Sequence, residues 1–124
     1  MNPYSIAVEV QSFYLAEQSD PDNRRYVFAY KVTLRNAGNV SAKLVSRHWV
    51  ISDTNGRVQE VRGDGVVGEQ PHLSPGESYH YTSGTVIETP MGSMHGSYQM
   101  VADDGVHFEA EIAPFSLSGP GTLH

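Results

Sequence analysis

The chain contains the stretch Tyr26-Val27-Phe28-Ala29-Tyr30-Lys31-Val32-Thr33-Leu34-Arg35, in which large apolar side chains recur at every second position. A period of two places successive side chains on opposite faces of an extended backbone, so the stretch predicts a β-strand with one buried face. The expected buried face consists of Tyr26, Phe28, Tyr30, Val32 and Leu34. Lys31, Thr33 and Arg35 fall on the opposite face.

Turn-forming residues divide the rest of the chain into similar segments. Asn36-Ala37-Gly38-Asn39 follows the first quoted stretch, and Asn55-Gly56 and Asp103-Asp104-Gly105 separate later apolar segments. Asn-Gly is a strong hairpin signal because a type I′ turn requires positive φ at both central residues. We expect about seven strands, at residues 6–15, 26–35, 42–53, 56–62, 78–83, 97–102 and 107–115.

The fold class follows from this spacing. Twelve Gly and seven Pro interrupt the chain, and no window has the helical spacing of apolar residues with suitable caps, so we expect little or no helix. About seven short antiparallel strands in 124 residues predict an all-β sandwich of two antiparallel sheets, of the fibronectin type III or immunoglobulin kind. We expect a single domain over residues 1–124, with its core at about 4–115 and a mobile tail at 116–124.

Composition excludes several classes of function. Apolar residues make up 39% of the chain and no run approaches the roughly 20 residues of a membrane helix, so we expect a soluble protein that has no membrane partner. The start of the chain has no secretion signal, which indicates a cytoplasmic location. With no Cys, thiol chemistry and cysteine-ligated metals are excluded, and the net charge of −6 disfavours nucleic acid as a ligand.

Trp49, the one tryptophan, is expected to anchor the core. Strict alternation places Arg47 on the same face as Val45, Trp49 and Ile51, where an unpaired guanidinium group would be very unfavourable. We therefore expect either a β-bulge near Arg47 or a position at the rim of the core beside a carboxylate, such as one of the late acidic residues.

The segment Gly63-Asp64-Gly65-Val66-Val67-Gly68 matches the pattern G-x-G-x-x-G, whose glycines can let a backbone approach a pyrophosphate. A dinucleotide site also needs a helix after the motif, and Glu69-Gln70-Pro71-His72 cannot begin one. We favour an irregular loop between strands that is shaped by the glycines. The alternative is a nest of backbone N–H groups that binds a small anion beside Arg62.

Other chemically suggestive residues predict no catalytic site. The six histidines (His48, His72, His80, His95, His107 and His124) show no metal-binding spacing, so we expect no metal site and no cofactor. Asp103-Asp104 is interpreted as a hairpin tip, and neither Ser83 nor Ser93 lies in a nucleophile motif. The sequence therefore predicts a protein that is not an enzyme.

An ordered series of motifs resembles the bacterial ApaG family. The motifs are Arg47-His48-Trp49-Val50-Ile51, residues 58–71, Pro75-Gly76-Glu77, Tyr81-Thr82-Ser83-Gly84-Thr85, residues 88–94 and Gly96-Ser97-Tyr98-Gln99-Met100. The likeness runs from about Tyr4 to Phe115. It implies a fibronectin type III-like sandwich, an association with cobalt resistance and magnesium efflux, and a surface that recognises other proteins. It also implies a pyrophosphate-binding element, carried here by Gly63, Gly65 and Gly68.

Three functional hypotheses remain. The leading hypothesis is a non-enzymatic protein-interaction and regulatory module with a partner of unknown identity, which displays two loops, at 63–71 and 84–94, and its exposed strand edges. The candidate residues are Arg62, Gly63, Gly65, Gly68, Glu69 and Gln70 in the first loop and Gly84, Thr85, Thr89 and Pro90 in the second. The alternatives are small-anion or nucleotide binding through the Gly63–Gly68 loop, and metal sensing by His and carboxylate groups that the fold brings together. Edge strands could also pair two copies into a homodimer.

Overall fold

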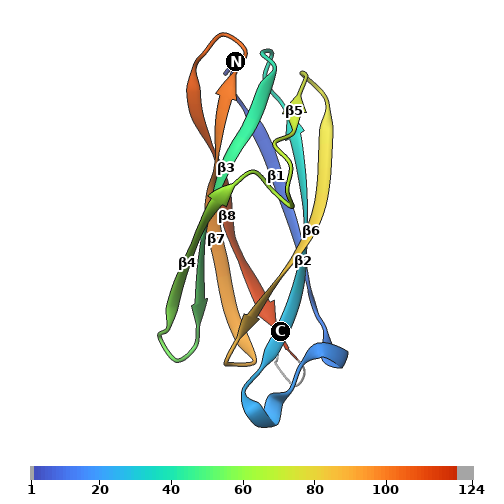
Figure 1. Ribbon diagram of the computed structural model, residues 1–124, viewed down its shortest axis with the longest axis vertical. Helices are drawn as coiled ribbons and strands as arrows, with labels where there is room; N and C mark the ends of the chain where they lie inside the picture. The colour runs from blue at the N-terminus through green and yellow to red at the C-terminus, as the bar shows by residue number, and fades with distance from the viewer. Residues whose placement is uncertain (1, 120–124) are drawn as a thin grey trace.

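The computed structural model describes residues 2–119 and consists of two antiparallel sheets packed face to face (Figure 1). The three-stranded sheet has the order β1 (Ile6–Tyr14), β2 (Tyr26–Asn36) and β6 (Ser78–Ile87). The five-stranded sheet has the order β4 (Val58–Asp64), β3 (Ala42–Asp53), β7 (Met91–Ala102) and β8 (His107–Ser118), and the short β5 (His72–Leu73) also pairs with β3. The predicted all-β sandwich is thus confirmed, with eight strands in place of about seven.

The core lies between the sheets and follows the alternation of β2. Phe28, Val32 and Leu34 are completely buried, and Tyr30 is nearly so. Trp49 of β3 packs edge-on against Tyr30, at 5.2 Å between ring centroids, and its exposed fraction is 2%. The prediction that Trp49 anchors the core is confirmed.

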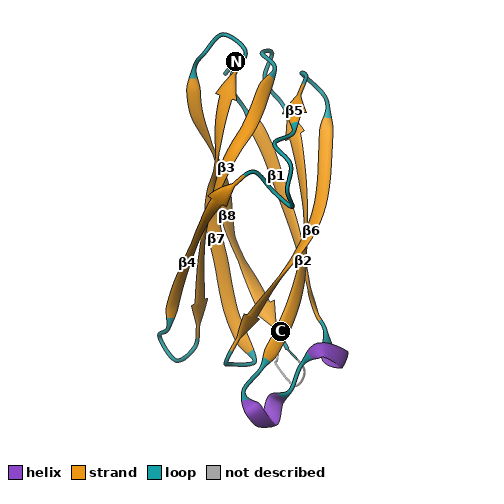
Figure 2. Cartoon of the chain, in the orientation of Figure 1, coloured by secondary structure: helices purple, strands orange, loops and turns teal. Residues whose placement is uncertain are grey.

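Among residues 2–119, helical structure is limited to two short 3₁₀ turns, η1 (Ala16–Gln18) and η2 (Pro21–Asn23), which connect β1 to β2 (Figure 2). Pro21 suits the first position of η2 because its fixed φ is helical and it lacks an N–H group. Neither turn contains a buried residue. The two turns therefore bridge the ends of the strands and add nothing to the core.

The hairpin between β3 and β4 differs in detail from the prediction. The amide of Asp53 donates to the carbonyl of Arg57 at 3.0 Å, and the positive φ falls on Gly56 (83°) and not on Asn55. The expected type I′ turn is therefore wrong. A three-residue connection needs one residue of positive φ, and it delays the start of β4 from the predicted Gly56 to Val58.

The predicted second loop, at residues 84–94, is largely β-strand. β6 continues to Ile87, which pairs with Tyr26 of β2, and β7 begins at Met91. Only the three residues 88–90 connect the two strands. Thr89 stabilises this connection, because its Oγ1 accepts a hydrogen bond from the amide of Thr54 at 3.2 Å. The glycines that suggested a loop instead lie within β6 and β7 and pair with residues of the neighbouring strands.

The start of the predicted tail is also part of the fold. β8 extends to Ser118, and the side chain of Leu117 is completely buried. The mobile tail predicted at 116–124 is therefore wrong for residues 116–118, and the core extends beyond the predicted limit of 115. The remainder of that prediction, at 120–124, lies outside the described residues.

The two long sides of the sandwich are built differently. On one side β1 approaches β8, where Ser12 Oγ donates to the carbonyl of Ser116 at 2.8 Å. On the opposite side, within residues 2–119, β4 pairs with β3 alone and β6 with β2 alone. Figure 1 shows β4 and β6 facing the viewer as the free edges of their sheets. This open side positions the site described next.

Candidate functional site

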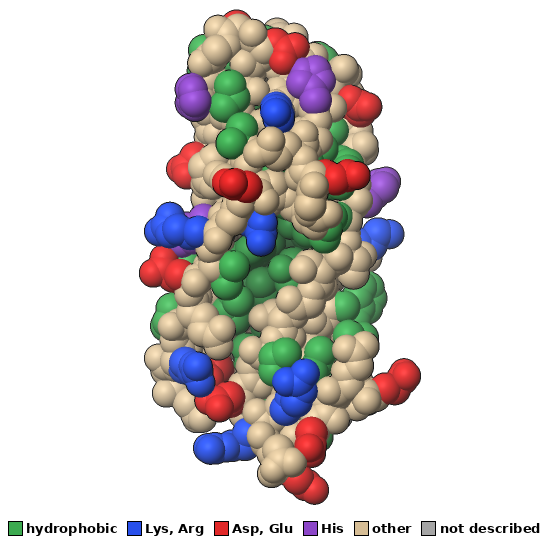
Figure 3. Space-filling view, viewed as in Figure 1, with side chains coloured by type: hydrophobic (Ala, Val, Ile, Leu, Met, Phe, Trp, Pro, Cys, Tyr) green, Lys and Arg blue, Asp and Glu red, His purple; other side chains and the backbone are tan. Residues whose placement is uncertain are grey.

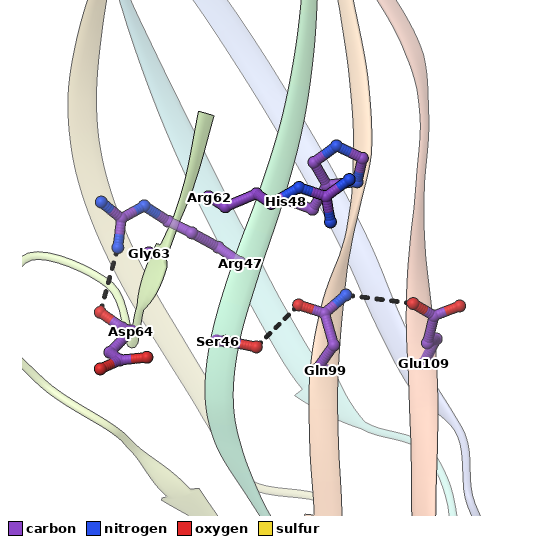
Figure 4. Close-up of a pocket in the computed structure, with 8 residues that line it drawn as sticks. All are labelled: Ser46, Arg47, His48, Arg62, Gly63, Asp64, Gln99 and Glu109. Atoms are coloured by element: carbon purple, nitrogen blue, oxygen red, sulfur yellow. Dashed lines mark hydrogen bonds between the residues drawn. The ribbon is translucent and has the colours of Figure 1, made fainter. Parts of the chain in front are cut away.

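Arg47 lies at the upper rim of the open side, on the same face of β3 as Trp49. A bulge at Val45 shifts the pairing of β3 with β7, but it precedes Arg47 and leaves this residue on the face of Trp49, so the predicted bulge does not explain the placement of Arg47. The predicted carboxylate partner is wrong. Arg47 Nη1 instead donates to the backbone carbonyl of Asp64 at 3.0 Å (Figure 4). The same nitrogen donates to the carbonyl of Gly65 at 2.9 Å. The chain bends back immediately after β4, which brings both carbonyls within reach of one guanidinium group.

The glycine-rich loop starts later than the sequence predicts. Gly63 and Asp64 are the last residues of β4, and the irregular backbone begins at Gly65, which has φ of 60°. Val66 is completely buried and fastens the loop to the core. Val67 and Gly68 form the tip, where Val67 is 56% exposed and has φ of 43°, a strained value for a β-branched residue. No helix begins within this described loop.

Three backbone amides at the base of the loop are already engaged. Gly65 N–H donates to the carbonyl of Val45 at 2.8 Å, and Val66 and Glu69 exchange hydrogen bonds at 2.8 and 2.9 Å. The Gln70 side chain also donates to the carbonyl of Val45, at 2.9 Å. A pyrophosphate bound here would compete with these carbonyl acceptors for the same N–H groups.

The candidate residues of the first loop therefore do not form one site. Gly63, Gly65, Glu69 and Gln70 meet at the base of the loop, whereas Gly68 lies at the tip. Arg62 pairs with His48 in the β3–β4 register, which places its side chain on the outer face of β4, 71% exposed and 3.6 Å from Glu60. The structure does not bring Arg62 to the loop amides.

A polar hollow of about 440 Å³ lies over the outer face of the five-stranded sheet. Figure 4 shows its residues, and two hydrogen bonds cross the strands: Ser46 Oγ to Gln99 Oε1 at 2.8 Å, and Gln99 Nε2 to Glu109 Oε2 at 3.1 Å. His48 Nε2 lies 2.8 Å from Glu60 beside it. Arg47, Arg62 and His48 are the basic side chains of the lining, and Asp64 and Glu109 the acidic ones.

A second cleft, of about 390 Å³, opens between β3 and β4 on one side and β6 on the other. Its lining is Tyr30, Arg47, Trp49, Ile51, Gln59, Val61, Ser83, Gly84, Thr85 and Val86. In Figure 3 the apolar floor is visible as a green hollow at the centre of the molecule, with Lys or Arg atoms at its upper edge. We call this feature the β4–β6 cleft.

Sequence reasoning missed the β4–β6 cleft, although Gly84 and Thr85 were among the candidates for a loop. The available signal was in β6, where the residues that face inward alternate as Tyr81, Ser83, Thr85 and Ile87. Tyr81 and Ile87 are buried, but the two hydroxyl residues between them are only partly covered. Inward hydroxyl groups in the middle of a sandwich strand indicate a place where the core is not closed.

The groups beneath the cleft are strongly desolvated. Burial raises the pKa of Tyr30, while the Ser83 hydroxyl and the charge of Arg47 act in the opposite direction. Burial also raises the pKa values of Tyr81 and Tyr98, whose hydroxyl groups hydrogen-bond to each other. The indole Nε1–H of Trp49 has no hydrogen-bond partner, and it is the one buried side-chain polar atom of residues 2–119 without one.

The described histidines and carboxylates form pairs and not larger clusters. Within residues 2–119, no three His, Asp or Glu side chains gather in a way that could hold a metal ion. His72 Nε2 pairs with Asp103 at 2.8 Å without a third ligand group. None of the described helical turns has the length and apolarity needed to span a bilayer.

Comparisons with known proteins assign the family. A family model described as the ApaG domain matches residues 16–102. Protein ApaG of Nitrosospira multiformis is 64% identical over 121 residues, which cover 98% of this chain and 95% of that protein. Protein ApaG of Dechloromonas aromatica is 58% identical over 123 residues, covering 99% and 97%. The crystal structure of a Bordetella pertussis protein with the provisional name ApaA matches with a TM-score of 0.94 at 51% identity, over 98% of both chains. The chain belongs to the ApaG family.

Proposed function

We propose that this protein is a non-enzymatic recognition and regulatory module that binds a protein partner at the open side of its sandwich, over the β4–β6 cleft. The observation that carries the proposal is a cleft with an apolar floor and polar walls, flanked by two strand edges that are unpaired within residues 2–119. A free edge presents unpaired N–H and C=O groups to which an extended segment of another protein can add. The cleft beside it can receive that segment's side chains.

Exposed apolar residues on both edges support the same surface. Val61 of β4 is 39% exposed and Val86 of β6 is 38% exposed, and both line the cleft. Val61 pairs with Trp49 and faces inward from β4, whereas Val86 lies at the rim on the outer face of β6, and Trp49 and Ile51 form the floor between them. A partner that covers the cleft would remove apolar surface from water on two sheets at once.

The proposal includes no catalytic step and no cofactor. Ser83 and Thr85 supply hydroxyl groups to the cleft, but its lining contains no His or carboxylate that could activate them. We propose that the module acts in the cytoplasm. We also propose that the family's association with cobalt resistance and magnesium efflux arises through the bound partner.

Capture of the partner with matched variants tests the proposal. Immobilised protein is exposed to a lysate of the cells in which the gene is native, and recovered proteins are identified and quantified by mass spectrometry. We expect Val61→Lys to abolish recovery of a stoichiometric partner. Val58→Lys is the matched control, because Val58 lies on the same strand but pairs with Ser52 on the outer face. Val67→Lys tests the loop tip in the same way.

The outcome of this comparison is clear in either direction. If Val61→Lys keeps the partner and Val67→Lys loses it, the partner binds the glycine-rich loop. This result would contradict the proposed surface. Light scattering on the free protein shows in parallel whether the open edges pair two copies of the chain into a homodimer.

A small anion is the second candidate ligand, because Arg47, Arg62 and His48 gather around the polar hollow on the outer face. Titration of isotope-labelled protein with pyrophosphate tests it. Shifts of the Arg62, Gly63 and Asp64 amides, whose residues line the hollow, at millimolar pyrophosphate would favour this function. Unchanged amides would exclude it.

A further inference from the structure

The chemistry of the β4–β6 cleft specifies what enters it, provided that the cleft is the recognition surface proposed above. Its volume of about 390 Å³ lies in the range of pockets that hold one compact ligand group. Four of its lining residues, Trp49, Ile51, Val61 and Val86, are apolar. The group that fills this part of the cleft is therefore an apolar side chain of substantial size.

Trp49 supplies an aromatic surface to the cleft. Its ring lines the cleft, although only 2% of the residue is exposed. The indole Nε1–H has no hydrogen-bond partner within residues 2–119, but it is buried away from solvent, so an occupant of the cleft cannot reach it directly. An occupant is thus expected to pack an apolar group against the ring.

Arg47 determines the charge of the group that binds beside the ring. It is the one charged residue in the cleft lining, in a protein whose net charge is −6. Its two side-chain hydrogen bonds within residues 2–119, to the carbonyls of Asp64 and Gly65, come from the same nitrogen, Nη1. A guanidinium group has five N–H donors, so the held side chain retains capacity for an anionic oxygen.

The spacing of the two residues fixes the pattern of the ligand. Arg47 and Trp49 are two positions apart on β3 and face the same side, so their side chains are separated by roughly 7 Å along the strand. An extended segment presents its own residues i and i+2 at that same distance and on one side. We propose that the β4–β6 cleft binds an extended segment of a partner polypeptide in which an apolar residue, placed against Trp49, lies two positions from an Asp or Glu that faces Arg47.

Nuclear magnetic resonance can test this recognition directly, because the chain has one tryptophan and hence one indole N–H signal. The probe is a terminally blocked peptide, Ser-Thr-Thr-Phe-Thr-Glu-Thr-Thr-Ser. The reversed order Glu-Thr-Phe is titrated beside it, because a strand can extend an edge in either direction. We expect one of the two to shift the indole signal and the amide signals of residues 83–86. Replacement of Glu by Gln in that peptide should weaken binding at least tenfold, and replacement of Phe by Ala should abolish it.

Variants of the protein assign the effect to individual groups. Arg47→Gln should remove the preference for Glu over Gln, whereas Arg57→Gln should keep it, because Arg57 pairs with Glu88 away from the cleft. Trp49→Phe keeps an aromatic ring but reduces the apolar surface beneath the cleft, and should weaken binding several-fold. The Glu-to-Gln comparison uses the unaltered protein, so it does not depend on whether Arg47→Gln folds.

Three results would overturn the inference. Equal binding of the Glu and Gln peptides would exclude the carboxylate. Absence of any shift at the indole and at residues 83–86 would exclude such a segment as the occupant. Equal shifts with free phenylpropionate would show that the cleft takes a small organic acid instead. In each case the capture experiment with Val61→Lys still decides separately whether a protein binds at the open side.

Discussion

Arg47 and Gly63 lie opposite each other in the β3–β4 ladder, and the guanidinium group of Arg47 fills the space that a side chain at position 63 would need. A Cβ atom added to Gly63 would lie 2.8 Å from Arg47 Nη2. Because Gly63 leaves this space empty, Arg47 can reach the carbonyls of Asp64 and Gly65. The glycine thus holds a positive charge at the rim of the β4–β6 cleft.

Gly63→Ala is expected to displace Arg47 and to lower the free energy of unfolding by about 1–2 kcal/mol, because two hydrogen bonds from a charged donor are lost. Urea unfolding measures this change. In an Arg47→Ala background the same glycine substitution should have a smaller effect, since the obstructing group is gone. Additive effects of the two substitutions would contradict the relationship.

Substitutions at two residues of the glycine-rich loop should change the stability of the protein in opposite directions. A Cβ on Gly65 would lie 2.1 Å from the carbonyl oxygen of Glu69, and its φ is 60°, so Gly65→Ala should destabilise the protein by more than about 2 kcal/mol. Val67 has a positive φ that asparagine tolerates better. Val67→Asn should therefore raise the stability by about 1 kcal/mol. Thermal unfolding compares both variants, and destabilisation by Val67→Asn would exclude strain at the tip.

The hydrogen bond from Tyr4 to Asp104 should make stability depend on pH in two ranges. Tyr4 Oη donates to Asp104 Oδ2 at 2.6 Å, which lowers the pKa of Asp104 below 3.8 and raises that of Tyr4 above 10.0. The stability that the hydrogen bond adds relative to Tyr4→Phe is therefore complete between pH 3.8 and pH 10.0, the ordinary pKa values of the two groups. It is lost as the pH falls through the lowered pKa of Asp104 or rises through the raised pKa of Tyr4. A constant difference between the unfolding midpoints at all pH values would contradict this.

The buried tyrosines should limit stability in alkali. Burial raises the pKa values of Tyr81 and Tyr98 above 10.0, so folding favours their neutral forms. Their contribution is complete below the ordinary pKa and declines as the pH rises past it, because the unfolded chain then releases protons that the folded chain retains. Tyrosinate absorbance should rise first from exposed tyrosines. The signals of Tyr81 and Tyr98 should follow only with loss of the far-ultraviolet β-sheet signal.

The alternation of apolar and polar residues correctly predicted which side chains of a strand face the core. The period of two in β2 identified its buried face, and the same rule placed Arg47 beside Trp49. The partners of Arg47 could not be predicted from the sequence. They are backbone carbonyls of residues 64 and 65, and every residue type carries a carbonyl, so no sequence pattern marks them.

Glycine content was misleading where two backbones approach closely. Residues 84–94 resemble a loop in composition, yet β6 and β7 occupy most of them. Just beyond, a Cβ on Gly96 would lie 2.0 Å from the carbonyl oxygen of His48 on the neighbouring strand. Glycine there allows close approach within a sheet, which composition alone does not distinguish from a turn. The β4–β6 cleft was missed for a different reason. Its two walls come from different sheets, and the pattern of a single strand does not show which strand lies opposite it.

Amide hydrogen exchange of the protein alone and with its captured partner tests the recognition surface most directly. We expect exchange to slow along β4 and β6 and at the Trp49 indole, because a segment bound at the open side shields these groups. Exchange along β1 and β8, on the closed side, should stay unchanged. Protection confined to residues 65–70, or to β1 and β8, would contradict recognition at the β4–β6 cleft.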